Sequence, residues 1–161
     1  MISLGELVNI LPQTGSVEWI GVRPAKFAQI CATTEIAAEV DRGLVGDRYA
    51  RRGGKRQVTL IQAEHLEAMA SMLDLASLEP QHLRRNIVVR GLNLLALKGK
   101  QFQIGGAVLE YSGLCHPCSR METVLGPGGY NAMRGHGGIN AKVVVAGNIR
   151  TNDKVRARWQ D

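Results

Sequence analysis

The residues best suited to chemistry are two cysteines three positions apart, Cys115 and Cys118, in the run Cys-His-Pro-Cys. Thiols at this spacing occur in zinc sites and in dithiol redox centres. Structural zinc needs four ligands, but the chain has no second pair of this kind, and His65, His82 and His136 stand at no ligand spacing. Two further interpretations stay open: two buried thiols in a loop, or one reactive or metal-ligating thiol with the other as its neighbour. We favour the last.

The residues around the pair bear on these alternatives. A dithiol redox centre should open a helix, because the helix dipole favours the thiolate of the first cysteine. The glycines and proline of segment 126–129 leave little room for such a helix. Arg120 lies two residues beyond Cys118, and a nearby guanidinium favours the thiolate, the form that attacks electrophiles and binds soft metals. His116 could assist in the same way or serve as a proton shuttle, although a lone histidine more often has a structural role.

A second cluster of polar residues could bind an anion. Arg84, Arg85 and Asn86 stand together before an apolar run, and paired guanidiniums beside a carboxamide would suit an anion and a hydrogen-bonding ring. The alternative is an exposed basic entry to a strand. Asp47 and Arg48 are neighbours in a polar loop, where they could form an internal ion pair.

Charge and composition narrow the class of ligand. The net charge is +6 and the pI about 9.6, and 14 of the 20 basic residues are arginine, which binds phosphate and carboxylate bidentately. A protein that binds single-stranded nucleic acid needs aromatic rings among its basic residues, but aromatics are only 4% of the chain, and Trp19, Phe27 and Trp159 lie far apart. We therefore expect an anionic small molecule, such as a phosphorylated cofactor, and regard nucleic acid as a poor fit.

The length of 161 residues predicts a single domain over residues 1–161. No apolar run reaches the roughly 20 residues of a membrane helix, and the first residues lack the pattern of a signal peptide. Three cysteines, an odd number, argue against a disulfide framework. We expect a cytoplasmic protein that does not bind membranes, with Cys31 as a small buried hydrophobic residue.

The elements that must position these residues are mostly strands. Short apolar, β-branched runs separated by glycines are typical of a barrel or sandwich, and Gly105-Gly106 between two such runs predicts a hairpin. The runs lie at 17–22, 34–40, 58–61, 87–89, 102–104, 107–111 and 143–145.

Helix is expected in two places. Apolar residues recur at helical spacing from Gln62 to Leu73, and a shorter turn is expected over 78–83. Segments 42–48, 113–129 and 133–138 are expected to be irregular. No βαβ alternation is visible, which argues against a doubly wound sheet.

Taken together, five segments in order resemble the MOSC family, which is named for the C-terminal domain of molybdenum-cofactor sulfurase. The resemblance covers about residues 3–156, with Tyr49 where the family often has histidine. The segments are Gly43–Arg48, Arg56–Ile61, Arg84–Val89, Cys115–Arg120 and Gly135–Asp153.

The resemblance implies a mainly β fold, a closed barrel with a few peripheral helices. It implies that Cys118 is the central residue, as a ligand of molybdenum or as a persulfide carrier of sulfur, and that the cofactor is molybdopterin. Arg48, Arg85, Asn86 and Arg120 fall in motifs expected to line the same pocket, and we add His116 to the cofactor-binding candidates. Pyridoxal phosphate binding is a further association at the level of the family.

The resemblance therefore implies a protein of molybdenum-cofactor metabolism, either a molybdenum-dependent oxidoreductase that reduces N-hydroxylated small molecules or a sulfur carrier. A partner protein would supply electrons or sulfur. The alternatives are a non-catalytic module that binds a cofactor or another anion, and a basic barrel associated with RNA.

Overall fold

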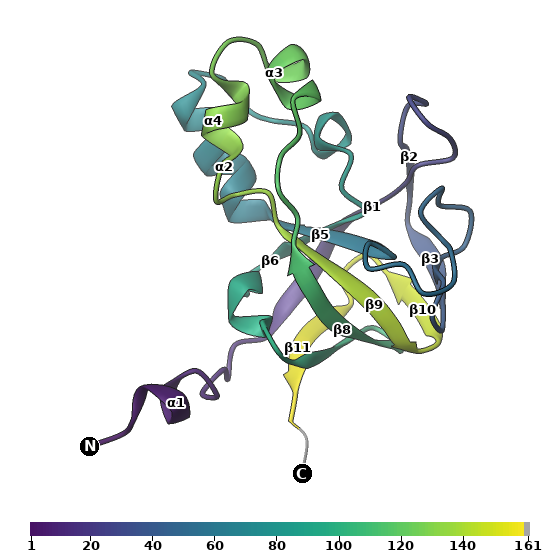
Figure 1. Ribbon diagram of the computed structural model, residues 1–161, viewed down its shortest axis with the longest axis vertical. Coiled ribbons are helices and arrows are strands. Elements are labelled where there is room, and N and C mark those ends of the chain that lie inside the picture. Colours follow the sequence, from purple (N-terminus) through teal and green to yellow (C-terminus); the bar gives the residue numbers. More distant parts are fainter. Residues whose placement is uncertain (160–161) are drawn as a thin grey trace.

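The centre of the protein is a closed β-barrel of seven strands (Figure 1). The computed structural model describes residues 1–159. The strands follow one another around the barrel in the order β11-β7-β8-β9-β5-β6-β1, and β1 closes it by pairing with β11. They are β1 (Gly15–Val22), β5 (Val58–Gln62), β6 (Ile87–Arg90), β7 (Gln101–Ile104), β8 (Ala107–Leu114), β9 (Ile139–Val145) and β11 (Lys154–Arg158).

Four further strands of the described residues lie outside the barrel circuit. β2 (Cys31–Thr33) pairs with the end of β1. A separate three-stranded sheet has the order β10-β3-β4, formed by β10 (Gly147–Arg150), β3 (Glu35–Glu39) and β4 (Gly43–Leu44). This sheet contributes buried Leu44 and Ile149 to the barrel core.

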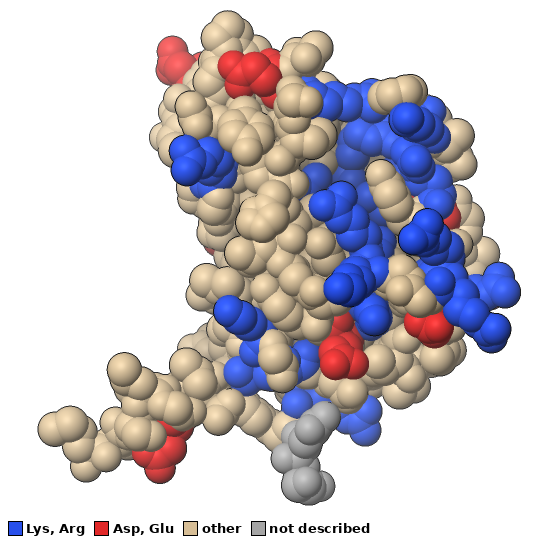
Figure 2. Space-filling model, in the orientation of Figure 1, with Lys and Arg blue, Asp and Glu red and all other residues tan. Residues whose placement is uncertain are grey.

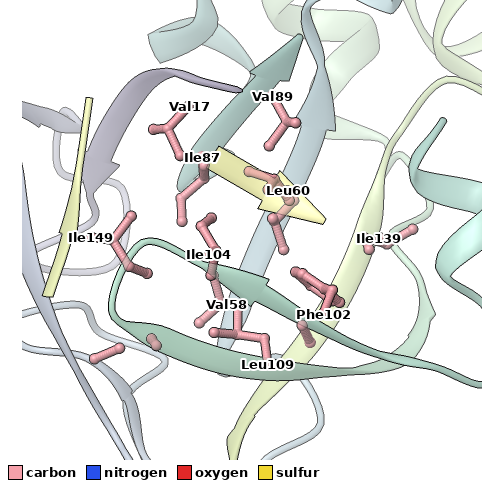
Figure 3. Packing of buried hydrophobic residues seen from close by; sticks show 14 of the residues in the cluster. Val17, Val58, Leu60, Ile87, Val89, Phe102, Ile104, Leu109, Ile139 and Ile149 are labelled. Carbon is pink, nitrogen blue, oxygen red and sulfur yellow. The ribbon is translucent and has the colours of Figure 1, made fainter. Parts of the chain in front are cut away.

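The barrel interior is filled by apolar side chains from alternate positions of the strands. Figure 3 shows Val58 and Leu60 from β5 packed with Phe102 from β7 and Leu109 from β8. All four are fully buried. Because the interior is packed, it leaves the surface and the ends of the barrel for binding.

Three helices gather at one end of the barrel (Figure 1). They are α2 (Ala63–Met72), α3 (Arg120–Leu125) and α4 (Gly129–Met133), and they cover a second, smaller core that includes Ile61 and Met69. Two 3-10 turns, η1 (Pro80–Leu83) and η2 (Leu94–Leu97), join neighbouring elements. The short helix α1 (Leu4–Leu7) buries no side chain and projects away from the barrel.

The mainly β barrel predicted from the sequence is confirmed, and so are most of its strands. The predicted core strands 58–61 and 87–89 are β5 and β6, the Gly105-Gly106 hairpin joins β7 to β8, and the helix predicted over 62–73 is α2, the longest helix among residues 1–159. The 78–83 turn is present as η1.

Four expectations were wrong. Segment 113–129 is not wholly irregular, because β8 extends to Leu114 and α3 fits before the glycines. One βαβ unit exists, since β5 and β6 are parallel and α2 connects them. Cys31 is exposed, because β2 lies at the edge of the sheet. Segment 42–48 contains the two-residue strand β4. In the described part of the chain, none of the helices has the length and apolar character needed to cross a membrane.

Candidate functional site

The cysteine loop connects β8 to α3 and presents its two thiols differently. Cys115 is buried, and its N–H donates to the carbonyl of Gly138 at 2.9 Å. Cys118 is exposed just before α3, and its carbonyl accepts from the N–H of Met121 at 2.9 Å. Backbone hydrogen bonds on both sides therefore fix the loop, and of its two cysteines Cys118 is the exposed one.

Arg85 ties this loop to the barrel. Its Nε donates to the carbonyl of Gly137 at 2.8 Å and one terminal nitrogen to that of Leu83 at 2.9 Å. The other terminal nitrogen reaches the carbonyls of Cys115 and His116 at 3.4 and 3.5 Å. Burial is the main cause that lowers the pKa of Arg85, although a guanidinium stays protonated in proteins. Because its donors are engaged by the protein, Arg85 positions the loop more than it offers hydrogen bonds to a ligand.

A cavity of about 210 Å³ opens beside Cys118, and the structure brings most of the sequence-predicted site residues to it. Arg48, Arg85, His116 and Arg120 all line it together with Cys118. Asn86 is the exception, since it lies fully buried behind the wall. The binding roles of these residues remain predictions.

A hydrogen-bonded cluster of Arg23, Asp47, Asn86 and Thr59 forms part of this wall: Arg23 and Thr59 line the cavity, and Asp47 and Asn86 lie behind them. The Arg23 guanidinium donates to both carboxylate oxygens of Asp47, at 3.0 and 2.8 Å, and to Asn86 Oδ1 at 2.8 Å. Asn86 in turn donates to Asp47 at 3.0 Å, and its Oδ1 accepts from the N–H and hydroxyl of Thr59 at 3.0 and 3.1 Å. Asn86 thus holds the cluster together.

This cluster corrects the expected ion pair within the polar loop. Asp47 pairs with Arg23 at 2.8 Å, and Arg48 is exposed, because the chain turns its two neighbouring side chains to opposite sides. Burial acts to raise the pKa of Asp47, but the hydrogen bonds and charge of Arg23 outweigh it and hold that pKa below its ordinary value. Arg23 was missed from the sequence, where it is a single arginine after a strand.

Two aromatic rings, also missed from the sequence, line the cavity. Phe27 is 67% exposed, and its ring lies 5.0 Å from Lys26 Nζ and 4.8 Å from the guanidinium carbon of Arg120. The guanidinium carbons of Arg23 and Arg48 lie 4.4 and 4.6 Å from the centroid of the Tyr49 ring. Each ring therefore has two cations within the range of cation–π attraction.

The loop that carries Phe27 is held over the cavity by Arg84. The Arg84 guanidinium donates to the carbonyls of Ala28 at 2.5 Å and Ala25 at 3.5 Å. Phe27 has a φ of 63°, which costs free energy in a residue with a bulky side chain.

The pKa of Arg84 is lowered, mainly by burial and then by the nearby charges of Arg120 and Arg23. Several positive charges are therefore held close together.

The cavity is strongly cationic. Within the described residues, no Asp or Glu lines it, and the cations are Arg23, Lys26, Arg48, Arg56, Arg84, Arg85 and Arg120. Figure 2 shows that Lys and Arg gather in a band over the side of the molecule that carries β2 and β3. Such a concentration of one sign of charge in a concave site attracts anions.

Larger hollows also lie on the surface. One of about 620 Å³ lies between α2 and strands β1 and β6, and contains none of the predicted site residues. Another, of about 430 Å³, lies on the other side of the cysteine loop and shares Cys115 and His116 with the cationic cavity. Burial is the main cause that lowers the pKa of His65 in this hollow, and the charge of His136 is the second. The centroids of the two rings are 4.9 Å apart.

The fold and the site define a small barrel protein with one exposed thiol at a cation-lined cavity. A sequence profile of the MOSC domain matches residues 41–156. The chain therefore belongs to the MOSC family, a family associated with proteins of molybdenum-cofactor biology.

Solved structures show the same fold. The YuaD protein from Bacillus subtilis superimposes with a TM-score of 0.80 at 19% identity, covering 94% of this chain and all of that one. YiiM from Escherichia coli has a TM-score of 0.69 at 17% identity, covering 91% of this chain and 71% of that one. YiiM from Geobacillus stearothermophilus has a TM-score of 0.71 at 16% identity, covering 90% of this chain and 75% of that one. A search of curated proteins found no match.

Proposed function

We propose that this protein binds the phosphorylated pterin form of the molybdenum cofactor, with Cys118 as a ligand of molybdenum or as the carrier of a persulfide sulfur. One observation carries the proposal: the exposed thiol of the cysteine loop opens onto a cavity walled by cations. A soft thiolate suits molybdenum and sulfur transfer, and guanidiniums suit a phosphate.

The donor set agrees with this cofactor better than with a bare metal ion. Among residues 1–159, no group of three or more His, Cys, Asp and Glu side chains could hold a metal. Cys118 would therefore be a single protein ligand to a metal that arrives with its own organic ligand. This also weighs against the zinc interpretation, because structural zinc needs four protein ligands.

The residues of the cavity have separate tasks in this proposal. Arg48 and Arg120 bind the phosphate, since both line the cavity and neither forms an ion pair within the described residues. Arg85 fixes the cysteine loop through its bonds to backbone carbonyls. His116 lines the cavity where it could donate a proton to a bound substrate or take one from it.

When bound, the cofactor would supply two-electron redox chemistry, which the reduction of an N-hydroxylated small molecule would need. A partner protein would then deliver electrons, or sulfur where Cys118 acts as a persulfide carrier. We further propose that the chain works in the cytoplasm as one MOSC domain.

The test is to express the protein in a molybdenum-replete host and to measure molybdenum and cysteine-bound sulfane sulfur in the purified protein. We expect Cys118→Ser to abolish loading, and Cys115→Ser, the matched control, to retain most of it, since Cys115 is buried. Equal loss in both variants would contradict the division of roles and would favour a dithiol centre. Unchanged loading in Cys118→Ser would point to a non-catalytic binding module.

A further inference from the structure

A second hollow of about 330 Å³ adjoins the cavity beside Cys118. The two share one wall, formed by Arg48, Tyr49 and Arg56, and the second hollow is completed by Arg51, Gly54 and Lys55. The shared wall makes them neighbouring parts of one concave surface.

The second hollow is also lined by positive charge without a carboxylate. Four of its six lining residues are Arg48, Arg51, Lys55 and Arg56. Segment 48–56 holds five cations and no acidic residue, and within residues 1–159 none of these cations forms an ion pair. Like charges gathered in this way repel one another, and a bound anion would relieve that repulsion.

The segment that carries these cations is anchored at both ends. At its start, the N–H groups of Tyr49 and Ala50 donate to the side chain and the carbonyl of the buried Asp47, at 3.1 and 3.0 Å. At its far end, the Ser112 hydroxyl donates to the carbonyl of Lys55. The cations therefore project from a loop tied to the buried cluster and to β8, which lowers the entropy cost of binding a ligand.

We propose that the second hollow is a subsite for a second phosphate, so that the site takes a ligand with two joined phosphate groups, as in a nucleoside diphosphate. One phosphate occupies the cavity beside Cys118, and the other lies past Arg48 and Tyr49, between Arg51 and Lys55. This proposal rests on the proposed function for the first phosphate. A compact ligand fits better than a nucleic acid strand, because the cations converge on two adjoining hollows.

The test is isothermal titration calorimetry of the full chain at low, fixed ionic strength, with inorganic phosphate and pyrophosphate as probes. We expect pyrophosphate to bind at least about tenfold more tightly than phosphate, because a second set of charge-assisted hydrogen bonds forms. Arg51→Ala/Lys55→Ala should reduce pyrophosphate affinity to that of phosphate and leave phosphate affinity nearly unchanged. The control, Lys98→Ala/Arg134→Ala, removes the same amount of charge from exposed positions elsewhere. It should still bind pyrophosphate more tightly than phosphate.

The outcomes separate this proposal from the proposed function. If phosphate binds but pyrophosphate binds no more tightly, or if the two double variants behave alike, the second subsite is wrong and the first survives. If neither probe binds, both fail. A ten-nucleotide single strand that binds more tightly than pyrophosphate, with an affinity that increases with its length, would overturn the subsite in favour of a nucleic acid surface.

Discussion

The residues around the cavity beside Cys118 form two groups that differ in what neutralises the charge of their arginines. Arg23 is buried, and the carboxylate of Asp47 and the carboxamide of Asn86 bind its guanidinium. Arg48 and Arg120 line the same cavity, but their charge has no acidic partner among the described residues. The first group is complete without a ligand, and the second is not.

The difference teaches how a basic protein divides its charge between stability and binding. A buried arginine needs a partner, because leaving its charge alone in the interior costs several kcal/mol. An exposed arginine keeps its hydration and costs little, so it stays available for an anion. Changes to the first group should therefore affect folding, and changes to the second should affect binding.

The largest effect is expected from Asp47→Asn, which keeps the shape but leaves the Arg23 charge buried without its counterion. We expect a loss of about 3–5 kcal/mol in the free energy of unfolding, measured by urea denaturation. Glu35→Gln, which removes the exposed pair with Arg150, is the control and should cost about 1 kcal/mol or less. Equal losses would show that Arg23 is not held by Asp47 in solution.

A smaller effect is expected from pH. The pKa of Asp47 is lower in the folded protein than its ordinary value, so its contribution to stability is present above the unfolded pKa and is lost as pH falls through the folded one. Stability should therefore decrease below about pH 4. The free energy of unfolding of the Asp47→Asn variant, measured by urea denaturation at each pH, should decrease less steeply over this range. Parallel curves of this free energy against pH for the two proteins would contradict the stabilising role of the Asp47 carboxylate.

The smallest effect on stability is expected at the cavity. Arg48→Ala and Arg120→Ala should change the free energy of unfolding by only about 0.5 kcal/mol, because Arg48 is exposed, Arg120 is only half-buried, and neither forms an ion pair within the described residues. Each should weaken phosphate binding by about tenfold, as expected for a lost charge-assisted hydrogen bond. A variant that unfolds readily but binds phosphate normally would reverse the roles of the two groups.

The fold was predictable where local patterns are strong. The Gly105-Gly106 hairpin and the apolar spacing of 62–73 are signals within one element, and both gave the right structure. The closing strand β11, Lys154–Arg158, was missed although its polar and apolar residues alternate, because two apolar residues among three charged ones are a weak signal. Its pairing with β1 and β7 is made between segments that are distant in the sequence.

The site shows the same limit. Cys118 and Arg120 stand together in the sequence, so their motif pointed to the cavity. Arg23 and Asp47 are 24 positions apart and meet only because the barrel brings the end of β1 beside the loop after β4. The sequence does not indicate that Asp47 is buried while Arg48 is exposed. The ion pair was therefore predicted between these two neighbours within the loop.

The most direct test of the central claim is a crystal structure of the protein from a molybdenum-replete host, with diffraction data collected above the molybdenum edge. We expect an anomalous peak bonded to Sγ of Cys118, or an additional sulfur on that atom, with phosphate density between Arg48 and Arg120. A peak elsewhere, or added density on Cys115 or Cys31 while Cys118 carries nothing, would contradict the account.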